Sequence, residues 1–227
     1  MTYTDFAPRH WNNPAKGSAI EQRWAQFWQL YKRGGWEPET KALVCETLKP
    51  GDLFLDIGAW IGPVTLWALD CGASVIAIEP DPVALEELRR RVPAEVEIHE
   101  CALGPETGTA RLAAASAYGD SMSRIAQNGV PVPIRTLPEI LSGRKPAMAV
   151  MDIEGYEMTL LPGLAPYLAS LGTTLVVALH NDPVPPSEWF ADYREVSIPK
   201  TARRGGGTRG RSLSVVARPC SPRESSL

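Results

Sequence analysis

The stretch that decides the fold reads Asp56-Ile57-Gly58-Ala59-Trp60-Ile61-Gly62, and Glu79-Pro80-Asp81 begins 17 residues after its last glycine. The mostly apolar run over 52–57 predicts a buried parallel strand. The glycines predict a tight turn into a helix over 63–69, and residues 74–78 predict a second strand that ends at an acid. Such an acid holds ribose hydroxyls in half of a nucleotide-binding unit, about 20 residues past the turn. Glu79 stands 21 residues past Gly58.

The middle of this turn holds Trp60, and it indicates which nucleotide fits. In dinucleotide-binding turns, a glycine at this place lets the backbone approach a pyrophosphate. The indole would obstruct that approach, so a cofactor with ribose and adenine but no phosphate fits better. S-adenosylmethionine (SAM) is such a cofactor. An NAD-type nucleotide enzyme is one alternative, and a glycine turn in an unrelated α/β protein is another.

The rest of the chain alternates predicted strands and helices, which indicates an α/β fold with a doubly wound, mostly parallel sheet. Helices are predicted from Ser18 to a break at Gly34-Gly35, and over 38–48, 82–92, 136–141 and 157–168, the last interrupted near Pro162-Gly163. Further parallel strands are predicted over 96–99, 147–152 and 174–179. Short antiparallel strands are predicted over 109–113 and 130–136, and a closing antiparallel pair over 194–198 and 212–217.

These elements predict an N-terminal helical extension over 1–50, a SAM-binding domain over 51–219 and a disordered tail over 220–227. The first helix carries an apolar and aromatic stripe at helical spacing, made of Ile20, Trp24, Phe27, Trp28 and Tyr31. We expect this stripe to pack against the domain. A lid over the active site or the face of a homodimer is the functional alternative.

Composition narrows the classes of partner. The net charge of −3 gives no general attraction to nucleic acid or to an anionic membrane. No apolar run reaches the roughly 18 residues that span a bilayer, and the first residues lack the pattern of a signal peptide. The four cysteines form no Cys-x-x-Cys pair, and three of them are predicted to be small buried thiols. We therefore expect a cytoplasmic protein with a small-molecule partner.

Several ordered motifs resemble the FkbM family of SAM-dependent methyltransferases. That family has an Asp-x-Gly-Ala-Asn-x-Gly turn, a Glu-Pro, an Ala-Leu-Gly, a Lys-x-Asp-x-Glu-Gly-x-Glu strand tip, a Leu-x-Gly helix and a late His. This chain supplies Asp56 to Gly62, Glu79-Pro80, Ala102-Leu103-Gly104, Met151 to Glu157, Leu161-Pro162-Gly163 and Leu179-His180. It departs from the family at Trp60, which replaces Asn, around Met151, where the strand often carries Lys or a nearby charge, and at Ala178, which replaces an acid. The resemblance implies a Rossmann-like class I methyltransferase fold.

Strand ends and the resemblance together suggest how SAM is held. Backbone around Gly58 should approach the methionine part, and the two oxygens of Glu79 suit the ribose diol. The resemblance implies that Cys101 and Ala102 flank adenine. Asp56 should orient the turn or the amino group, although it could simply cap the turn. The expected cofactor set is Asp56, Gly58, Ala59, Trp60, Gly62, Glu79, Pro80, Cys101, Ala102 and Asp152.

Methyl transfer to a hydroxyl of a small molecule, sugar or natural product requires a positioned base. The candidates are Asp152, Glu154 and His180, and a neutral imidazole suits this work near pH 7. His180 could equally be structural, and Glu154 could fix its loop. The loop over 118–123 is expected to form an acceptor-side wall, and the N-terminal segment and the insertion over 104–138 are expected to determine specificity.

Two further alternatives stay open. Asp152, Asn181 and Asp182 are oxygen ligands that a Mg²⁺-like cation would accept, although Asn-Asp-Pro is also an ordinary turn sequence. We favour an enzyme without a metal. The second alternative is a non-catalytic SAM-binding or partner-binding module that uses the aromatic N-terminal helix.

Overall fold

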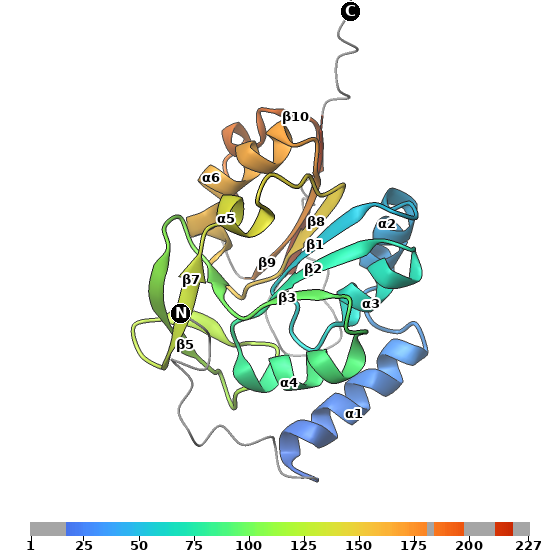
Figure 1. Ribbon diagram of the computed structural model, residues 1–227, viewed down its shortest axis with the longest axis vertical. Coiled ribbons are helices and arrows are strands. Elements are labelled where there is room, and N and C mark those ends of the chain that lie inside the picture. The colour runs from blue at the N-terminus through green and yellow to red at the C-terminus, as the bar shows by residue number, and fades with distance from the viewer. Residues whose placement is uncertain (1–16, 181–183, 198–211, 220–227) are drawn as a thin grey trace, which may run out of the picture.

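The computed structural model describes residues 17–180, 184–197 and 212–219, and it has a central seven-stranded sheet between two layers of helices (Figure 1). The strands lie side by side in the order β10 (Tyr193–Ser197), β11 (Ser212–Pro219), β9 (Thr174–His180), β8 (Met148–Met151), β1 (Leu53–Ile57), β2 (Ser74–Ile78) and β3 (Glu97–His99). The strands from β9 to β3 run parallel, and β11 is antiparallel to both of its neighbours. The predicted doubly wound sheet with a closing antiparallel pair is confirmed.

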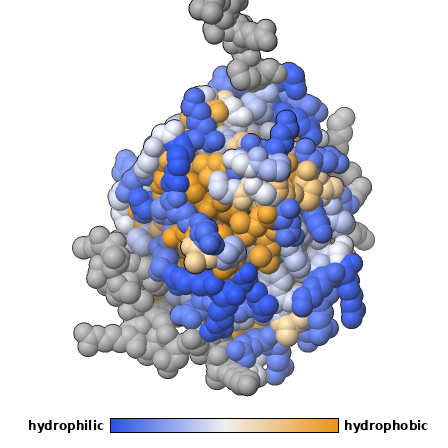
Figure 2. All heavy atoms as spheres, turned by 45° about the vertical axis from the view of Figure 1, so that its right-hand side comes forward, coloured by the Kyte–Doolittle hydropathy of each residue, from blue (hydrophilic) through white to orange (hydrophobic). Residues whose placement is uncertain are grey.

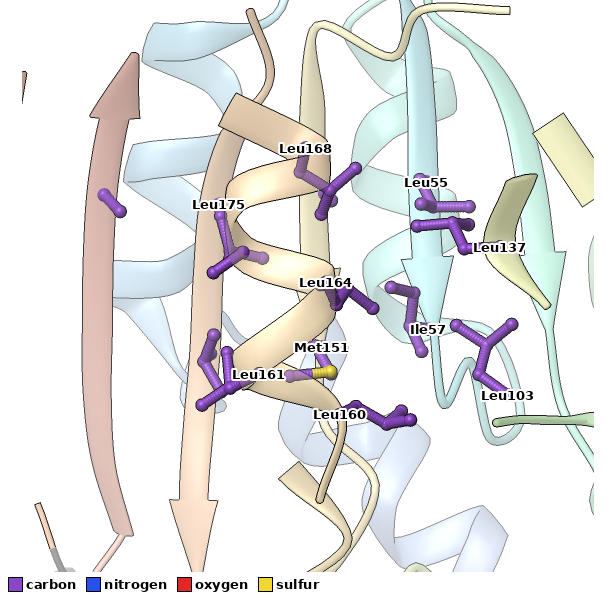
Figure 3. Packing of buried hydrophobic residues seen from close by; sticks show 14 of the residues in the cluster. Leu55, Ile57, Leu103, Leu137, Met151, Leu160, Leu161, Leu164, Leu168 and Leu175 are labelled. Carbon is purple, nitrogen blue, oxygen red and sulfur yellow. The ribbon is translucent and has the colours of Figure 1, made fainter. Parts of the chain in front are cut away.

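Alternate residues of the central strands face opposite helical layers, because successive side chains of a strand point to opposite faces. Phe54 of β1 belongs to the core formed with α2 (Pro38–Thr47), α3 (Pro63–Asp70) and α4 (Pro82–Arg91). Leu55 and Ile57 belong to the core formed with α5 (Leu137–Leu141) and α6 (Glu157–Ser170). Figure 3 shows leucines of α6 directed onto this second face of the sheet. Burial on both faces explains why these strands read as continuous apolar runs.

The predicted helix starts are present. Ser18 caps α1 (Ala19–Lys32), Asp81 caps α4, and Thr136 caps α5, each by accepting a backbone N–H in the first turn. The predicted interruption of α6 is wrong, because the helix continues through Pro162 and Pro166 to Ser170. Its buried leucines and Ala165 pack on the sheet, and this packing outweighs the backbone hydrogen bonds that the prolines remove.

A second, smaller sheet stands between β3 and α5. Its strands have the order β4 (Ala102–Leu103), β7 (Val130–Arg135), β5 (Gly108–Ala113) and β6 (Arg124–Ala126). The predicted antiparallel pairing of β5 with β7 is confirmed, whereas β4 and β6 were not predicted. Ala102, Leu112 and Val132 form the small core of this insertion. The connection over 114–123 returns towards the main sheet, where it reaches the functional site.

The aromatic stripe of α1 packs against the domain, as predicted. Ile20, Trp24 and Trp28 are buried together with Ile61 and Ala84. Figure 1 shows α1 lying along α4 on the side of the molecule that carries α3. Helices α1 and α2 both precede β1, and the division into an N-terminal extension and a SAM-binding domain stays a prediction. Residues 1–16 and the predicted tail over 220–227 lie outside the described residues.

The surface over α2 and α3 is partly apolar. When this side of the molecule is turned towards the viewer, apolar side chains gather near its middle with hydrophilic ones around them (Figure 2). Leu43, Leu66 and Leu69 are half-buried residues of these two helices. No helix in the described ranges is long and apolar enough to cross a membrane.

The prediction of buried thiols is only partly correct. Cys101 is buried, but Cys71 is half-buried and Cys45 is exposed. The last two lie on α2 and at the end of α3, two surface helices that pack side by side, and their Sγ atoms are 3.3 Å apart. The apolar residues beside them in the sequence lie on the inward faces of these helices, whereas the two cysteines lie on the outward faces. This is why apolar context alone predicted their burial wrongly.

Candidate functional site

A cavity of about 280 Å³ lies at the carboxyl ends of the parallel strands, where ligands of open α/β sheets bind. Strand tips from β1, β2, β8 and β9 reach it, together with the turn before β4. The structure brings most of the predicted site residues into its lining, namely Asp56, Gly58, Ala59, Trp60, Glu79, Pro80, Cys101, Ala102, Asp152 and Glu154. Segments as far apart as residues 56 and 154 therefore meet in one space.

Glu79 is held rigidly at the tip of β2. Its Oε2 accepts the backbone N–H of Trp60 at 2.8 Å, and its Oε1 accepts that of Asp81 at 2.7 Å. The side chain is only 6% exposed. Burial, followed by the nearby Asp81 carboxylate, raises the pKa of Glu79 to about 8, against the lowering effect of the two N–H donors. Each carboxylate oxygen keeps a second lone pair that can accept a hydroxyl from a ligand.

Asp56 takes a structural place beneath the turn. It is buried, and its Oδ2 accepts the hydroxyl of Thr65 in the first turn of α3 at 2.5 Å. Burial raises the pKa of Asp56 to about 6, while the hydrogen bonds from Thr65 act in the opposite direction. The carboxylate thus fixes the helix that follows the turn, and a role of Asp56 towards the cofactor's amino group stays a prediction.

Gly58 and Gly62 both have left-handed backbone, with φ of 84° and 92°. A Cβ on Gly58 would lie 1.9 Å from the carbonyl oxygen of Asp152, so the turn after β1 touches the tip of β8. Gly62 is the N-cap of α3, where a Cβ would meet Leu88 at 2.7 Å. Gly58 therefore lies in the cavity wall, whereas Gly62 lies behind it and permits close helix packing.

The loop after β8 is fixed by an acid that was not among the predicted site residues. Glu157 is fully buried, and its oxygens accept the backbone N–H groups of Ile153 at 3.0 Å and Gly155 at 2.7 Å. Glu154, between them, has left-handed backbone with φ of 57°. The signal was present as the last acid of the Glu-Gly-x-Glu motif. Glu157 thus holds the loop that carries Glu154 into the cavity lining.

Two other segments complete the wall. The N-terminal helices and their connection contribute Phe27, Trp36, Glu37 and Thr40, and the insertion contributes Asp120, Ser121, Ser123, Arg124 and Ile125. The loop over 118–123 was expected at the site, whereas Trp36 and Glu37 were missed. They could not be found from sequence, because nothing in the pattern of α1 and α2 says how the connection folds over the sheet.

The described part of the lining is strongly acidic. Among the described residues it holds six carboxyl groups and one guanidinium, from Glu37, Asp56, Glu79, Asp120, Asp152, Glu154 and Arg124. The pKa of Glu79 is raised to about 8, so its share of this charge is largely neutralised by a proton near pH 7, whereas Asp56, with a pKa raised to about 6, stays mostly ionised. The excess of carboxyl groups favours a cationic or uncharged ligand over an anion.

The remaining predicted residues, His180, Asn181 and Asp182, lie at the end of β9 or beyond the described residues. The backbone of His180 ends β9 opposite Ser212, and its side chain is outside the described part of the chain. Asn181 and Asp182 are also outside it. Among the residues that are described, no group of three acidic, histidine or cysteine side chains could hold a metal ion. The roles considered for these three residues stay predictions.

Comparisons with known proteins agree with this geometry. The family model described as the methyltransferase FkbM domain matches residues 56–183, more than half of the chain. The crystal structure of a methyltransferase FkbM from Methylobacillus flagellatus superposes with a TM-score of 0.51 at 17% identity, covering 74% of this chain and 44% of that one. At this identity the likeness shows the fold alone.

One curated relative is a protein-L-isoaspartate O-methyltransferase of Methanospirillum hungatei. It is 31% identical over 125 residues, which are 54% of this chain and 56% of that protein. The chain thus spans little more than half of this relative's length. The matched region of the family model contains the whole run of motifs from Asp56 to His180. The chain belongs to the FkbM methyltransferase family.

Proposed function

We propose that this protein is a SAM-dependent methyltransferase that methylates a hydroxyl oxygen of an uncharged or cationic small molecule, such as a sugar or a natural product. The observation that carries the proposal is that one cavity joins the buried acid Glu79 to Asp152 and Glu154. A ribose-binding acid and candidate bases therefore face the same space. A cofactor and an acceptor could therefore bind side by side and react within this one cavity.

The residues present fit the cofactor. Gly58 and Ala59 lie in the cavity wall, and the missing side chain of Gly58 lets the turn after β1 pack directly on the carbonyl of Asp152. Glu79 offers lone pairs to a ribose diol, and Cys101, Ala102 and Leu103 offer an apolar place for adenine. When bound, SAM would supply a methyl group on its sulfonium sulfur, and that sulfur would be the group displaced by a nucleophile in line with it. The chain therefore has to supply alignment and a place for the acceptor's proton.

The proton of the acceptor hydroxyl must leave as the new carbon–oxygen bond forms. Asp152 and Glu154 can accept it through carboxylate oxygens, and His180 is the third candidate. Glu157 and the left-handed backbone at Glu154 keep the loop after β8 in one conformation. A fixed loop supports catalysis because little reorganisation is needed at the moment of transfer.

The acidic lining bears on the acceptor. The curated relative is named for an acceptor that is a carboxylate. In the cavity of this chain, an anionic acceptor would meet six carboxyl groups and one guanidinium among the residues that the structure describes. Charge repulsion in a partly desolvated site disfavours that pairing, so we propose a hydroxyl and not a carboxylate as the methylated group.

Two rivals are distinguishable. An NAD-type enzyme needs close approach of a pyrophosphate at the turn, where Trp60 lies in the wall. A non-catalytic SAM-binding module would keep the cofactor site and lack turnover. A cytoplasmic location, a possible homodimer and the absence of nucleic-acid partners stay predictions.

The test is transfer from SAM carrying a radiolabelled methyl group. Matched acceptors differ only in charge: a neutral methyl glycoside, the corresponding amino sugar and the corresponding uronic acid, with an isoaspartyl peptide beside them. We expect label in the neutral or amino compound at an oxygen, and none in the acids. Preferred labelling of the acids or the peptide would contradict the proposal. Tight cofactor binding without turnover across a broad panel would favour the binding module.

A further inference from the structure

Four hydrogen bonds close a ring around the cofactor acid. Glu79 accepts the backbone N–H groups of Asp81 and Trp60 on its two oxygens. The Oδ2 of Asp81 accepts the backbone N–H of Gly119 at 2.8 Å, and the carbonyl of Gly119 accepts the indole N–H of Trp60 at 2.9 Å. The ring therefore joins the turn after β1, the tip of β2 and the insertion between β5 and β6.

Trp60, a member of this ring of hydrogen bonds, has an unfavourable backbone conformation. Its φ of 49° is in the left-handed region, which bulky side chains rarely adopt and which asparagine and glycine tolerate. The strain lies directly at the peptide that aims an N–H at Glu79. Strained backbone persists only where the surrounding contacts determine it, and such positions gather at functional sites.

The contacts of the indole supply that determination. Besides its bond to Gly119, the ring packs edge-on against Phe27 of α1, with centroids 4.7 Å apart. Gly119 is itself immobilised, because Asp81 holds its N–H and a Cβ there would lie 2.7 Å from Val83 and 2.9 Å from Trp24. The Oδ2 of Asp81 also accepts the hydroxyl of Ser123 at 2.6 Å, which fixes the same loop again. The carbonyl that receives the indole is thus a rigid anchor.

We propose that Trp60 is a positioning residue: its indole, tethered to Gly119, holds the left-handed backbone that directs the N–H of residue 60 at Glu79. The tether fixes the carboxylate for the ribose diol and links the insertion to the cofactor turn. The inference rests on the proposed cofactor site at Glu79. It concerns a position at which this chain departs from the motif of the family it resembles.

The proposal predicts that the Phe and Asn variants of Trp60 rank in one order for affinity and in the reverse order for stability. Trp60→Phe keeps a bulky ring in left-handed backbone but removes the tether, so the turn should relax and cofactor affinity should fall. Trp60→Asn loses more packing, yet asparagine adopts this backbone without a tether. Stability should therefore decrease in the order wild type, Phe, Asn. Affinity should decrease in the order wild type, Asn, Phe.

Trp24 provides a matched control. Its indole N–H also donates to the carbonyl of Gly119 at 2.9 Å, and its ring is buried. It belongs to α1 and to the core there, outside the described lining of the cavity. Trp24→Phe removes the same kind of bond from the same acceptor. It should lower the melting temperature while leaving affinity within about twofold of wild type.

The probe is S-adenosylhomocysteine, titrated by calorimetry into the full chain, with thermal unfolding measured on the same samples. We expect Trp60→Phe to raise Kd about tenfold, the worth of one well-placed hydrogen bond, and Trp60→Asn to stay within about threefold. An unchanged Kd for Phe, or an Asn variant weaker than Phe, overturns the proposal. If Phe does not fold, a tenfold loss in Asn overturns it, and retained affinity supports it.

Glu79→Ala separates this inference from the site on which it rests. If Glu79→Ala weakens binding and Trp60→Phe does not, the cofactor site stands and the positioning role falls. If neither variant changes Kd, the cofactor site itself is misplaced and the proposed function loses its main support. Equal weakening by Trp24→Phe and Trp60→Phe would also overturn the proposal, because general loosening of the Gly119 anchor would then explain both.

Discussion

Gly58 and Asp152 are in such close contact that any side chain at position 58 would occupy the place of the Asp152 carbonyl, with a Cβ 1.9 Å from its oxygen. The two residues directly follow the neighbouring parallel strands β1 and β8. Their contact joins the cofactor turn to the loop that carries the candidate bases. The site therefore depends on a bare backbone at this position.

Gly58→Ala should lower the free energy of unfolding by about 2–5 kcal/mol, because left-handed strain adds to overpacking against backbone. Gly155→Ala is the matched control, since Gly155 has φ of 100° but nothing within 4 Å of a Cβ. It should cost only about 1–2 kcal/mol, the strain alone. Urea denaturation of both variants gives the comparison. Equal losses would mean that the Gly58 contact relaxes freely.

Glu79→Ala should weaken SAM binding by about 1–3 kcal/mol, because hydroxyl hydrogen bonds to a charged acceptor are lost. Glu87→Gln is the control: Glu87 is another buried acid, on α4, and it accepts the indole N–H of Trp28 at 3.2 Å, whereas Glu79 accepts the backbone N–H of Trp60. It should leave affinity unchanged. Calorimetry measures both, and NAD should give no heat of binding. A folded Glu79→Ala protein with wild-type affinity would remove Glu79 from the site.

Cofactor binding should depend on pH through Glu79. Its pKa is raised to about 8 in the free protein, so the carboxyl is largely protonated at pH 6.5. Ribose hydroxyls donate best to the ionised form, so binding should lower this pKa and release a proton. Affinity should then rise with pH up to about 8 and level off above it. Titrations in buffers of different ionisation heat count the protons.

Glu79→Gln isolates this group from others that titrate nearby, such as Asp56 with a pKa of about 6. The variant should bind more weakly and lose the dependence of Kd between pH 7 and 8.5. A wild-type affinity that is flat across this range, with no proton release, would mean that Glu79 has the same protonation in the free and the bound protein, and would contradict the prediction.

The nucleotide half of the fold could be predicted from sequence because each of its signals is local. A buried strand, a glycine turn and a capped helix are each encoded within a few residues, and Asp81 caps α4 as its spacing indicates. The packing of α1 was also predictable, since its stripe has helical period. Pro162 was misread because local propensity favours a break where tertiary packing continues the helix.

The rest of the site depends on contacts between distant segments. Gly119 reaches the cofactor turn only because Asp81 and two tryptophans bind its peptide group, and these partners are 38, 59 and 95 residues away. Among the described strands, β6 pairs with β5 alone, and it has three residues, so its sequence carries little signal. Trp36 enters the wall through the connection between two helices, whose direction no local pattern encodes.

Activity should persist in excess EDTA, and added Mg²⁺ should change it little, because we propose a reaction that needs only alignment and a base. Asp152→Asn is a second test of the metal alternative. Asparagine keeps an oxygen that can accept a hydrogen bond, but it lacks the negative charge that a cation would need. Loss of turnover in EDTA, restored by Mg²⁺, would move Asp152, Asn181 and Asp182 from orientation to metal ligation.

The identity of the base is tested by three variants, His180→Ala, Asp152→Asn and Glu154→Gln. If His180 accepts the proton, His180→Ala should lower kcat on the order of 10²–10⁴-fold, and SAM affinity should stay within about twofold. The wild-type rate should also fall as pH drops through about 6.5, because a protonated imidazole cannot accept. The two acid variants should keep most of their turnover. Near-normal kcat in His180→Ala, with a large loss in Asp152→Asn or Glu154→Gln, would assign the base to that carboxylate. Collapse of SAM binding in His180→Ala would instead make His180 a structural support of the pocket.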